Sequence, residues 1–536
     1  MHYVIAYDIG TTGVKTCLFS IADKVELIGG AYGAYKLYLL ENGGAEQDPD
    51  EWWEAMCSTT KEVLEKTGIA KEKIEAISFC SQMQGLVLVD KEGRALRRAM
   101  SYMDNRAGDV YRKLGGGLIR ISGLGAYKLF KSLYLTTAAP TSVKDPLWKY
   151  NWVRVHEPEI YAKVHKWLDV KEYLICRASG ECVMTRDSAY ATFLYDTRRG
   201  KEGWSASLCR TYGVDQNHLP RVIDCAQAAG TLTAHAAEEL GLCAGTTVFG
   251  GGGDATLIGV GAGCTRVGQT HIYSGTSGWV STVVDKQIVD IVSMIAAVVG
   301  VKDGIYNYFA EMETAGKCFE WVKEHLALDE IGIYLKKQTV EESEESLYLS
   351  LYDYLSDTVK KAPPGAGGVI FTPWLHGNRC PFEDENAAGM FFNIRLETGK
   401  TEMIRAVLEG IGFHLRWMME CEAKKVKIHD TIRFVGGGAL SPVTCQILSD
   451  ITGKVIETVN HAQDVGAMGA AMTAGIGLGL IPSLEQAGDY VSVTRRYEPQ
   501  PDNRAVYEKN YRVFRELHAA NGKLFRTLNG KQKEGA

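Results

Sequence analysis

The sequence predicts an α/β fold made of two related halves, and three observations support this prediction. The chain has 536 residues, which is long for one domain and suits two or three. Predicted strands alternate with predicted helices along its length. A unit of strand, Gly/Thr turn and strand occupies residues 6–19 and recurs in weaker form at residues 270–280. This internal repeat predicts two related domains with a cleft between them and a boundary near residues 256–265.

The first Gly/Thr turn joins two predicted buried strands, residues 4–6 and 17–19. Its candidate ligand-binding residues are Asp8, Gly10, Thr11, Thr12 and Gly13. The glycines let backbone N–H groups approach an anion because no Cβ stands in the way, and the threonines add hydroxyl donors. The aspartate suits a hydrated cation such as Mg²⁺. By itself this stretch fits a nucleotide phosphate site and an ordinary hairpin turn with a capping aspartate equally well.

The first half continues with a helix at residues 49–67. Asp48 is a good N-cap, Pro49 suits the first helical position, and Gly68 ends the helix. Beyond it we expect strands at 74–80 and 86–89, a helix after residue 107, loops and short helices over 115–145, a helical pattern over 147–174, an irregular segment that becomes strand-like over 185–196, and a strand that enters a glycine turn over 248–256.

The second half repeats this alternation after its own Gly/Thr turn. We expect a helix at 401–420, a strand at 431–435, a glycine turn at 436–439, a helix capped by Ser441 that runs to about residue 452, a strand at 454–459 and a helix at 465–475. From about residue 495 the pattern is charged and helical, and it fades into a polar tail at residues 529–536.

Composition excludes several classes of partner. Hydrophobic residues make up 46% of the chain and charged residues 23%, which is typical of a soluble globular protein. The net charge of −6 gives no reason to expect nucleic acid or an anionic membrane as a partner. The apolar run 291–301 is too short to span a bilayer, and the N-terminus lacks a signal pattern. We therefore expect a cytoplasmic enzyme with no nucleic-acid or membrane partner.

Cysteine usage supports the same compartment. The chain has 13 cysteines, an odd number, and no CxxC pair. Cys17, Cys80 and Cys445 lie inside apolar runs. Buried free thiols in a reducing compartment explain this pattern better than disulfides do.

Three glycine turns, each after a predicted strand, carry the chemistry. They lie at residues 10–13, 275–278 and 436–439. Two such turns facing each other would cradle a triphosphate, and the third, at a helix N-terminus, would pack against a purine and its ribose. A Walker-type site is excluded because no G-x-x-x-x-G-K-[ST] motif occurs. Gly399-Lys400-Thr401 resembles the end of this motif, but Ile394 occupies the upstream position where the motif requires a glycine.

These motifs resemble those of the FGGY family of carbohydrate kinases, and of its xylulokinase branch in particular. The matching segments are DIGTT at 8–12, QDP at 47–49, QMQG at 82–85, DNRA at 104–107, GGD at 252–254, SGTS at 274–277, IRAVLE at 404–409 and GGGA at 436–439. The resemblance implies two ribonuclease H-like domains of the actin, hexokinase and Hsp70 type, with ATP and Mg²⁺ in the cleft. It places a sugar-binding N-terminal domain at 1–256, an ATP-binding C-terminal domain at 257–494, and a helix with a tail at 495–536.

The resemblance makes Asp254 the candidate general base. A sugar hydroxyl is a poor nucleophile at neutral pH, so a carboxylate must accept its proton as the P–O bond forms. The flanking glycines let a substrate come close. The alternative is a turn aspartate that caps a helix beginning at Ala255. Asp8 and Asp254 are also the predicted partners of the metal ion.

The remaining implied roles fall into two groups. The predicted ATP and phosphate contacts are Gly10, Thr11, Thr12, Lys15, Gly275, Thr276, Gly436 and Gly437, with Lys15 open to the alternative of a solvated strand residue and Gln446 a possible reader of the base. The predicted sugar contacts are Met83, Gln84, Asp104, Arg106 and Asp254. Asp104 can accept from two neighbouring hydroxyls, whereas Arg106 fits a plain salt bridge at a helix start equally well.

Three positions depart from the family pattern. Asp145 stands where an apolar residue is usual, and Asn393 stands where a glycine is usual. In the sugar loop, Gln84 replaces the histidine typical of xylulokinases, which keeps a donor and an acceptor but loses the imidazole. The change at Gln84 leaves the kinase prediction intact, but it leaves the identity of the sugar undetermined.

The sequence therefore predicts an ATP-dependent sugar kinase, with D-xylulose as the leading substrate and D-xylulose 5-phosphate as the product. The alternatives within this class are kinases of another polyol, ketose or sugar acid, such as erythritol, ribulose or gluconate. A different class is an ATP-binding sensor on the same fold, since fold alone does not determine function. A homodimer is a further possibility.

Overall fold

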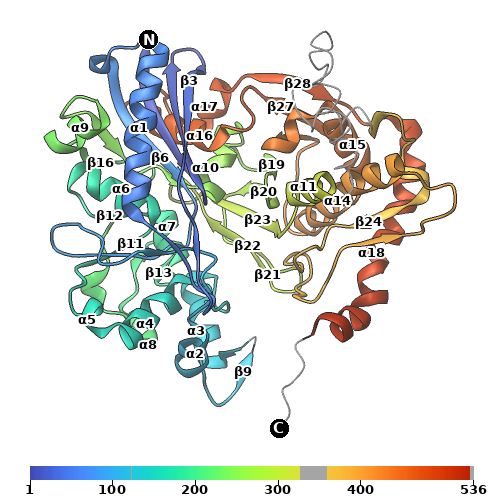
Figure 1. The fold of residues 1–536 in the computed structure, drawn as a ribbon, viewed down its shortest axis with the longest axis horizontal. Helices are drawn as coiled ribbons and strands as arrows, with labels where there is room; N and C mark the ends of the chain where they lie inside the picture. Colours follow the sequence, from blue (N-terminus) through green and yellow to red (C-terminus); the bar gives the residue numbers. More distant parts are fainter. Residues whose placement is uncertain (122, 326–358, 531–536) are drawn as a thin grey trace, which may run out of the picture.

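The structure, a computed structural model, describes residues 1–121, 123–325 and 359–530. Two large mixed sheets form its framework, one in each half (Figure 1). The first has the order β16-β17-β6-β1-β2-β3, with β18 beside β6: β1 (His2–Ile9), β2 (Gly13–Ile21), β3 (Val25–Ala34), β6 (Ile74–Ser81), β16 (Ala228–Thr231), β17 (Thr247–Phe249) and β18 (Gly252–Gly253).

The second sheet has the order β21-β22-β23-β20-β19-β26-β27-β28. Its strands are β19 (Thr270–Ser274), β20 (Gly278–Val284), β21 (Val289–Asp290), β22 (Ile295–Val299), β23 (Tyr306–Met312), β26 (Thr431–Val435), β27 (Val455–Val459) and β28 (Val493–Tyr497). Shorter strands form small two- and three-stranded sheets around the first half, among them β7 (Val87–Val89), β11 (Lys166–Leu168) and β12 (Val183–Thr185).

The two sheets share one topology. In the first, β1 and β2 are antiparallel, β3 extends the sheet antiparallel to β2, and β6 and β17 run parallel on the other side of β1. In the second, β19, β20, β23, β26 and β27 take the same five places with the same directions. The predicted two-domain α/β fold with an internal repeat is therefore confirmed.

Helices cover these sheets. Those of the first half are α1 (Pro49–Thr67), α2 (Gly108–Leu114), α3 (Ala126–Thr136), α4 (Pro146–His156), α5 (Pro158–Tyr161), α6 (Val170–Ser179), α7 (Arg186–Ala191), α8 (Ala206–Tyr212), α9 (Ala234–Leu240) and α10 (Asp254–Gly261). Those of the second half are α11 (Gly316–His325), α14 (Lys400–Ala423), α15 (Pro442–Thr452), α16 (Val465–Gly477), α17 (Leu484–Ala487) and α18 (Pro501–Asn529). Asp48 caps α1 and Ser441 caps α15, as predicted.

Helices α10 and α16 join the two halves between the sheets (Figure 1). α16 comes late in the chain but packs on β1, β2 and β6 of the first sheet. α10 leaves the first sheet and packs on β19 of the second, where a Cβ at Gly259 would lie 2.9 Å from His271 Cε1. One buried apolar cluster accordingly runs through both halves and includes Phe19, Leu257, Ile432 and Met468.

Three predicted segments differ from the structure. Residues 147–174 form two helices, the strand β11 and then α6, because Trp167 and Leu168 pair with β7 and become buried. The polar segment 185–196 contains the buried helix α7, since tertiary packing satisfies its polar side chains. Around residue 495 the chain first adds β28 to the second sheet, and α18 begins only at Pro501. Residues 531–536 of the predicted tail lie outside the described residues.

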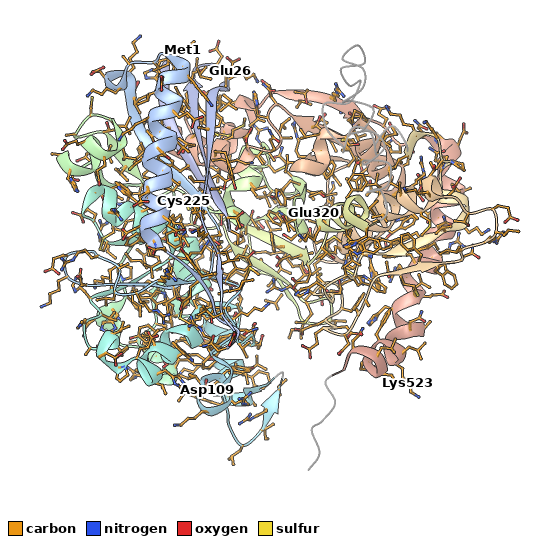
Figure 2. All side chains as sticks on the ribbon, viewed as in Figure 1. Met1, Glu26, Asp109, Cys225, Glu320 and Lys523 are labelled. Carbon is orange, nitrogen blue, oxygen red and sulfur yellow. A yellow bond between two sulfur atoms is a disulfide. The ribbon has the colours of Figure 1, made fainter. Side chains whose placement is uncertain are left out.

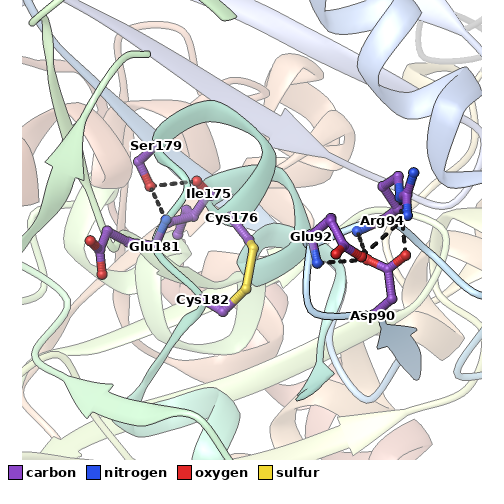
Figure 3. Close-up of a disulfide and its surroundings, with 8 residues drawn as sticks. All are labelled: Asp90, Glu92, Arg94, Ile175, Cys176, Ser179, Glu181 and Cys182. Carbon is purple, nitrogen blue, oxygen red and sulfur yellow. Dashed lines mark hydrogen bonds and ion pairs between the residues drawn. A yellow bond between two sulfur atoms is a disulfide. The ribbon is translucent and has the colours of Figure 1, made fainter. Parts of the chain in front are cut away.

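The prediction that the cysteines are free thiols is wrong for one pair. Cys176 and Cys182 form a disulfide between the end of α6 and the start of β12 (Figure 3). The turn at Gly180, whose φ is 78°, brings the two Cα atoms to 4.6 Å, a closeness that sequence spacing did not reveal. Among the predicted buried thiols, Cys17, Cys80 and Cys445 are free and buried.

The apolar run 291–301 is used inside the second half. It contains the short sheet strand β22. Across the described ranges, no helix combines the length and the apolar character that crossing a membrane requires.

The crossing of α10 and α16 leaves no room for side chains at two positions. A Cβ at Gly469 would lie 2.2 Å from Leu257 O, and one at Gly261 would lie 1.9 Å from Val465 O. We expect Gly469→Ala to lower the free energy of unfolding by ~1–3 kcal/mol, because a backbone carbonyl cannot move aside as a side chain can. Urea unfolding measures this change.

A matched control is Gly108→Ala in the first turn of α2, where a Cβ would meet only the end of the Arg112 side chain at 3.8 Å. This variant should unfold like the wild type. Equal stability of the two variants would contradict the tight crossing.

Candidate active site

The first glycine turn is held from beneath by polar side chains. Tyr35 donates from its hydroxyl to Gly10 O at 2.6 Å and to Gly13 O at 3.0 Å, and Gln82 Nε2 donates to Gly10 O at 2.9 Å. Above the turn, Thr12 is exposed and Thr11 is half-buried. The carbonyls of the turn are thus engaged by the protein, while its two threonines remain on the accessible side, as a phosphate-binding role requires.

Asp8 and Lys15 lie directly opposite each other on β1 and β2. A Cβ at Gly466 would lie 2.8 Å from Asp8 Oδ2, so the carboxylate faces the start of α16. Burial raises the pKa of Asp8, and the Lys15 charge opposes the rise. Lys15 Nζ donates to Gln463 O at 2.7 Å and lies 3.5 Å from Asp464 Oδ1. Its ammonium therefore links the first turn to the second half.

The second glycine turn is tied to the N-terminal end of α11. Gly316 N donates to Gly275 O at 2.8 Å, and Ala315 N donates to Thr276 O at 3.1 Å. Thr276 itself is exposed. This turn repeats the arrangement of the first one, with fixed carbonyls and an accessible threonine.

The third glycine turn lies against the second. Gly436 has a φ of 89°, and a Cβ there would lie 2.6 Å from Ser274 O, so only glycine fits. Gly436 N donates to Ala462 O at 2.8 Å, and Ala462 directly precedes the loop 463–464 that Lys15 contacts. Gly437 is exposed, with open space around it. The three predicted turns are therefore brought together, through contacts that run from Lys15 to Ser274.

Tyr273, which the sequence reasoning missed, stands beside the second and third turns. Its ring stacks on Trp279 at a centroid distance of 4.0 Å, and a Cβ at Gly436 would lie 3.1 Å from its Cε2. Burial raises its pKa, and the charges of Asp8 and Asp254 raise it further. An aromatic residue at the end of a strand just before a Gly/Thr turn was the available signal.

Asp254 is the first residue of α10, and its Oδ1 accepts a hydrogen bond from Ala255 N at 2.7 Å. Burial raises its pKa to about 7, and the charges of Asp8, Glu311 and Asp169 add to the rise. Glu311 lies on β23, so carboxylates of both halves surround this aspartate. A group that titrates near neutral pH in such a setting is suited to accept a proton.

The loop predicted to bind the sugar lies against the Asp254 turn. A Cβ at Gly253 would lie 2.1 Å from Met83 Sδ, so the methionine side chain covers this glycine. Gln84 has a φ of 64°, and Asp169 holds this strained position by accepting from Gln84 N at 2.9 Å and from Gly85 N at 2.8 Å.

Lys149 supports the same loop from inside and was also missed. It is fully buried, and its Nζ donates to Gln84 O at 2.8 Å and to Ser101 O at 2.7 Å. Burial lowers its pKa to about 8, while the charges of Asp104, Asp169 and Asp145 oppose the fall. Lys149 lies among aromatic residues in the first turns of α4, and nothing in that pattern indicated a role at the site.

Asp104 and Arg106 bind each other. Arg106 Nη2 lies 2.7 Å from Asp104 Oδ2 and 2.7 Å from Glu46 Oε1, and Ala45 N donates to Asp104 Oδ2 at 2.9 Å. The Asp104 side chain is fully buried. The structure thus contains the salt bridge weighed as the alternative for Arg106, and a sugar contact through either residue stays a prediction. Gln446 donates instead to Asp450 and to Glu498 O at 2.8 and 2.9 Å.

Two departures from the family pattern have local explanations. Asn393 has a φ of 67°, a left-handed conformation that asparagine tolerates better than most residues, and its Nδ2 donates to Gly368 O at 3.0 Å. Asp145 is buried and accepts from Ser142 N at 2.9 Å, and burial raises its pKa to about 7. The bond from Ser142 N gives this buried carboxyl a hydrogen-bond partner.

Among the described residues, no group of three or more His, Cys, Asp or Glu side chains forms a metal site. The charge of Asp8 nevertheless raises the pKa of Asp254, so these two carboxylates lie close enough to interact. This two-carboxylate set fits a largely hydrated Mg²⁺ ion shared with a nucleotide, rather than a metal held by protein alone.

Comparisons with known proteins agree with the two-domain fold. Residues 3–261 match the model of the FGGY family of carbohydrate kinases, N-terminal domain, and residues 271–478 match the model of its C-terminal domain. The chain therefore belongs to the FGGY family of carbohydrate kinases, which are ATP-dependent kinases of sugars.

Similar proteins carry more than one substrate name. The chain is 27% identical to the xylulose kinase of Bacillus subtilis (strain 168) over 99% of this chain and 100% of that protein. It is also 27% identical to the gluconokinase of the same organism, over 96% of this chain and 94% of that protein. A ligand-bound xylulose kinase structure from Lactobacillus acidophilus superposes with a TM-score of 0.82 at 24% identity, over 98% of this chain and 100% of that one.

Asp169 offers a test of how the loop at residues 83–85 is held. Its two oxygens accept from three backbone N–H groups, those of Gln84, Gly85 and Val170. In Asp169→Asn one of these donors would face an amide NH₂ group, so the loop should shift. We expect the Michaelis constant for the sugar to rise about 5–30-fold, the equivalent of ~1–2 kcal/mol, with that for ATP unchanged.

Initial rates at varied sugar and varied ATP measure both constants. The control is Asp90→Asn, the same chemical change at an exposed turn where Asp90 accepts from Glu92 N and Arg94 N. An equal rise in the two Michaelis constants of Asp169→Asn would argue against a role confined to the sugar side.

Proposed function

We propose that this protein transfers the γ-phosphoryl group of ATP to D-xylulose and forms D-xylulose 5-phosphate. The observation that carries the catalytic part of the proposal is Asp254. Its pKa of about 7, its place at the start of α10 and its proximity to Asp8 suit a general base beside bound phosphates. Met83 brings the candidate sugar loop to the same turn.

In the proposed reaction, the sugar hydroxyl oxygen attacks the γ-phosphorus of ATP. The new O–P bond forms as the bond between that phosphorus and the β,γ-bridging oxygen breaks, and ADP leaves. Asp254 accepts the hydroxyl proton. The threonines of the first and second turns donate to phosphate oxygens, and the exposed Gly437 lets the adenosine approach. A bound Mg²⁺ ion near Asp8 and Asp254 would neutralise phosphate charge.

We propose a matching division of the chain. Residues 1–256 bind the sugar and supply the first phosphate turn, and residues 257–494 supply the other two turns and bind ATP. The segment from residue 495 supports the ATP-binding part, since α18 packs on α14, α15 and β24 (Ile370–Thr372).

The choice of D-xylulose rests on the relatives and on the loop. A xylulose kinase matches over 99% of the chain, and Gln84 keeps a donor and an acceptor next to Met83. The equally similar gluconokinase favours a second candidate, a kinase of a sugar acid such as gluconate, and Gln84 also leaves erythritol and ribulose open. A non-catalytic sensor would have no need of both Asp254 and a sugar loop.

The base role predicts a large effect of one substitution. We expect Asp254→Asn to lower the rate of sugar phosphorylation by about 10²–10⁴-fold, because the hydroxyl then has no proton acceptor. ADP binding, measured by calorimetry, should persist. In the wild type, kcat/KM should fall as the pH drops through about 7, since the carboxyl is then protonated. Turnover near the wild-type rate in Asp254→Asn would remove it from this role.

A substrate panel tests the sugar. We expect D-xylulose to give the highest kcat/KM when ADP release is measured with D-xylulose, D-ribulose, D-gluconate and erythritol in parallel. If D-gluconate or another compound were phosphorylated and D-xylulose were not, the kinase assignment would stand and the D-xylulose proposal would fail. ATP turnover without any sugar product across a wider panel would favour the sensor.

A further inference from the structure

Helix α10 lacks a cap of its own. Its N-cap residue is Gly253, which has no side chain to accept from the free N–H groups of the first turn. The residue that follows is Asp254, whose carboxylate direction depends on how firmly this helix end is held. Another part of the chain supplies an acceptor for the N–H of Gly253 itself.

That acceptor is Asp187 on α7. Its Oδ2 accepts from Gly253 N at 2.7 Å, and the side chain is almost fully buried. Burial by itself raises the pKa of Asp187, but Lys171 and hydrogen bonds from Thr185, Gly253 and Thr256 outweigh it and hold the pKa below its ordinary value. Thr256 lies in the first turn of α10. An ionised carboxylate therefore caps α10 from outside, where the helix end carries partial positive charge.

A buried cation and hydroxyl groups hold Asp187 in turn. Thr185 donates from Oγ1 to Asp187 Oδ1 at 2.5 Å. Lys171, which is fully buried, donates from Nζ to Thr185 Oγ1 and to Ser188 Oγ, both at 2.6 Å, and pairs with Glu172. The thiol of Cys225, inside the first half (Figure 2), lies 3.8 Å from Asp187 Oδ1.

Burying this cluster of charged side chains costs free energy that a purely structural role does not explain. Taking two carboxylates and an ammonium out of water costs several kcal/mol per ion, and packed apolar residues would often be as stable. Its one backbone contact with the candidate catalytic turn is the bond to Gly253 N, which also lies under Met83. A rigid acceptor at this point fixes both the direction of Asp254 and the surface on which the sugar loop rests.

We propose that Asp187 is a positioning residue for phosphoryl transfer: it binds the N–H of Gly253, the N-cap residue of α10, and so holds the Asp254 carboxylate in its working direction. The inference rests on the proposed role of Asp254 as the base. Asp187 acts on Asp254 through the backbone, by its bond to Gly253 N.

The test is Asp187→Asn in the full-length protein. This change keeps the size of the side chain and removes its charge. We expect kcat to fall at least tenfold while the Michaelis constants for sugar and ATP change less than threefold. A residue that only stabilises the fold would lower the melting temperature and leave kcat of the folded enzyme in place.

Two further variants complete the test. Ser188→Ala removes a different contact of Lys171, on the helix that carries Asp187, and leaves the Gly253 bond intact, so it should lower the melting temperature without lowering kcat. Thr185→Val removes the 2.5 Å bond to Asp187 and should reproduce the kinetic pattern in smaller measure. It carries the test if Asp187→Asn does not fold.

The outcomes separate the two proposals. Wild-type kcat in folded Asp187→Asn, or in Thr185→Val when that variant carries the test, overturns the positioning role. Equal effects of Asp187→Asn and Ser188→Ala also overturn it. Full turnover in Asp254→Asn instead overturns the base assignment, whatever the Asp187 variants show.

Discussion

The close crossing of α10 and α16 is the contact on which the rest of the structure depends. Backbone meets backbone at Gly261 and Gly469, so neither helix can move without the other. Each helix also has a candidate site carboxylate at its N-terminal end: α10 begins with Asp254, and the start of α16 faces Asp8. One packing contact between the halves therefore sets the distance between the candidate base and the candidate metal partner.

Around this crossing, the candidate site is built in two layers. The accessible layer consists of backbone turns with short hydroxyl side chains, which suits ligands that carry their own charge. Behind it lies a layer of buried ions, in which Asp169 and Lys149 hold the loop at Gln84 and Asp187 holds Gly253. The inner layer costs desolvation energy, and it specifies position, which a polar site needs more than it needs additional stability.

Much of the fold and part of the site followed from local pattern. The Gly/Thr turns, the strands beside them and the caps at Asp48 and Ser441 depend on residues that are neighbours in the chain, so the sequence displays them. Helix α7 and the strand β11 were not predicted, because packing against distant segments overrides their weak local preferences. The positive φ at Asn393, a conformation that glycine adopts without strain, was likewise not visible in the sequence.

By itself, the sequence determined the two-domain α/β architecture, the three glycine turns, the family and the candidate base, because each rests on a contiguous motif. Only the tertiary structure decided which buried partners support those motifs. Tyr273, Lys149, Asp169 and Asp187 reach the site from separate elements, and Asp104 turns to Arg106. Hydrogen bonds and ion pairs between residues far apart in the chain leave no periodic pattern in the sequence. Only the folded structure shows which residues form them.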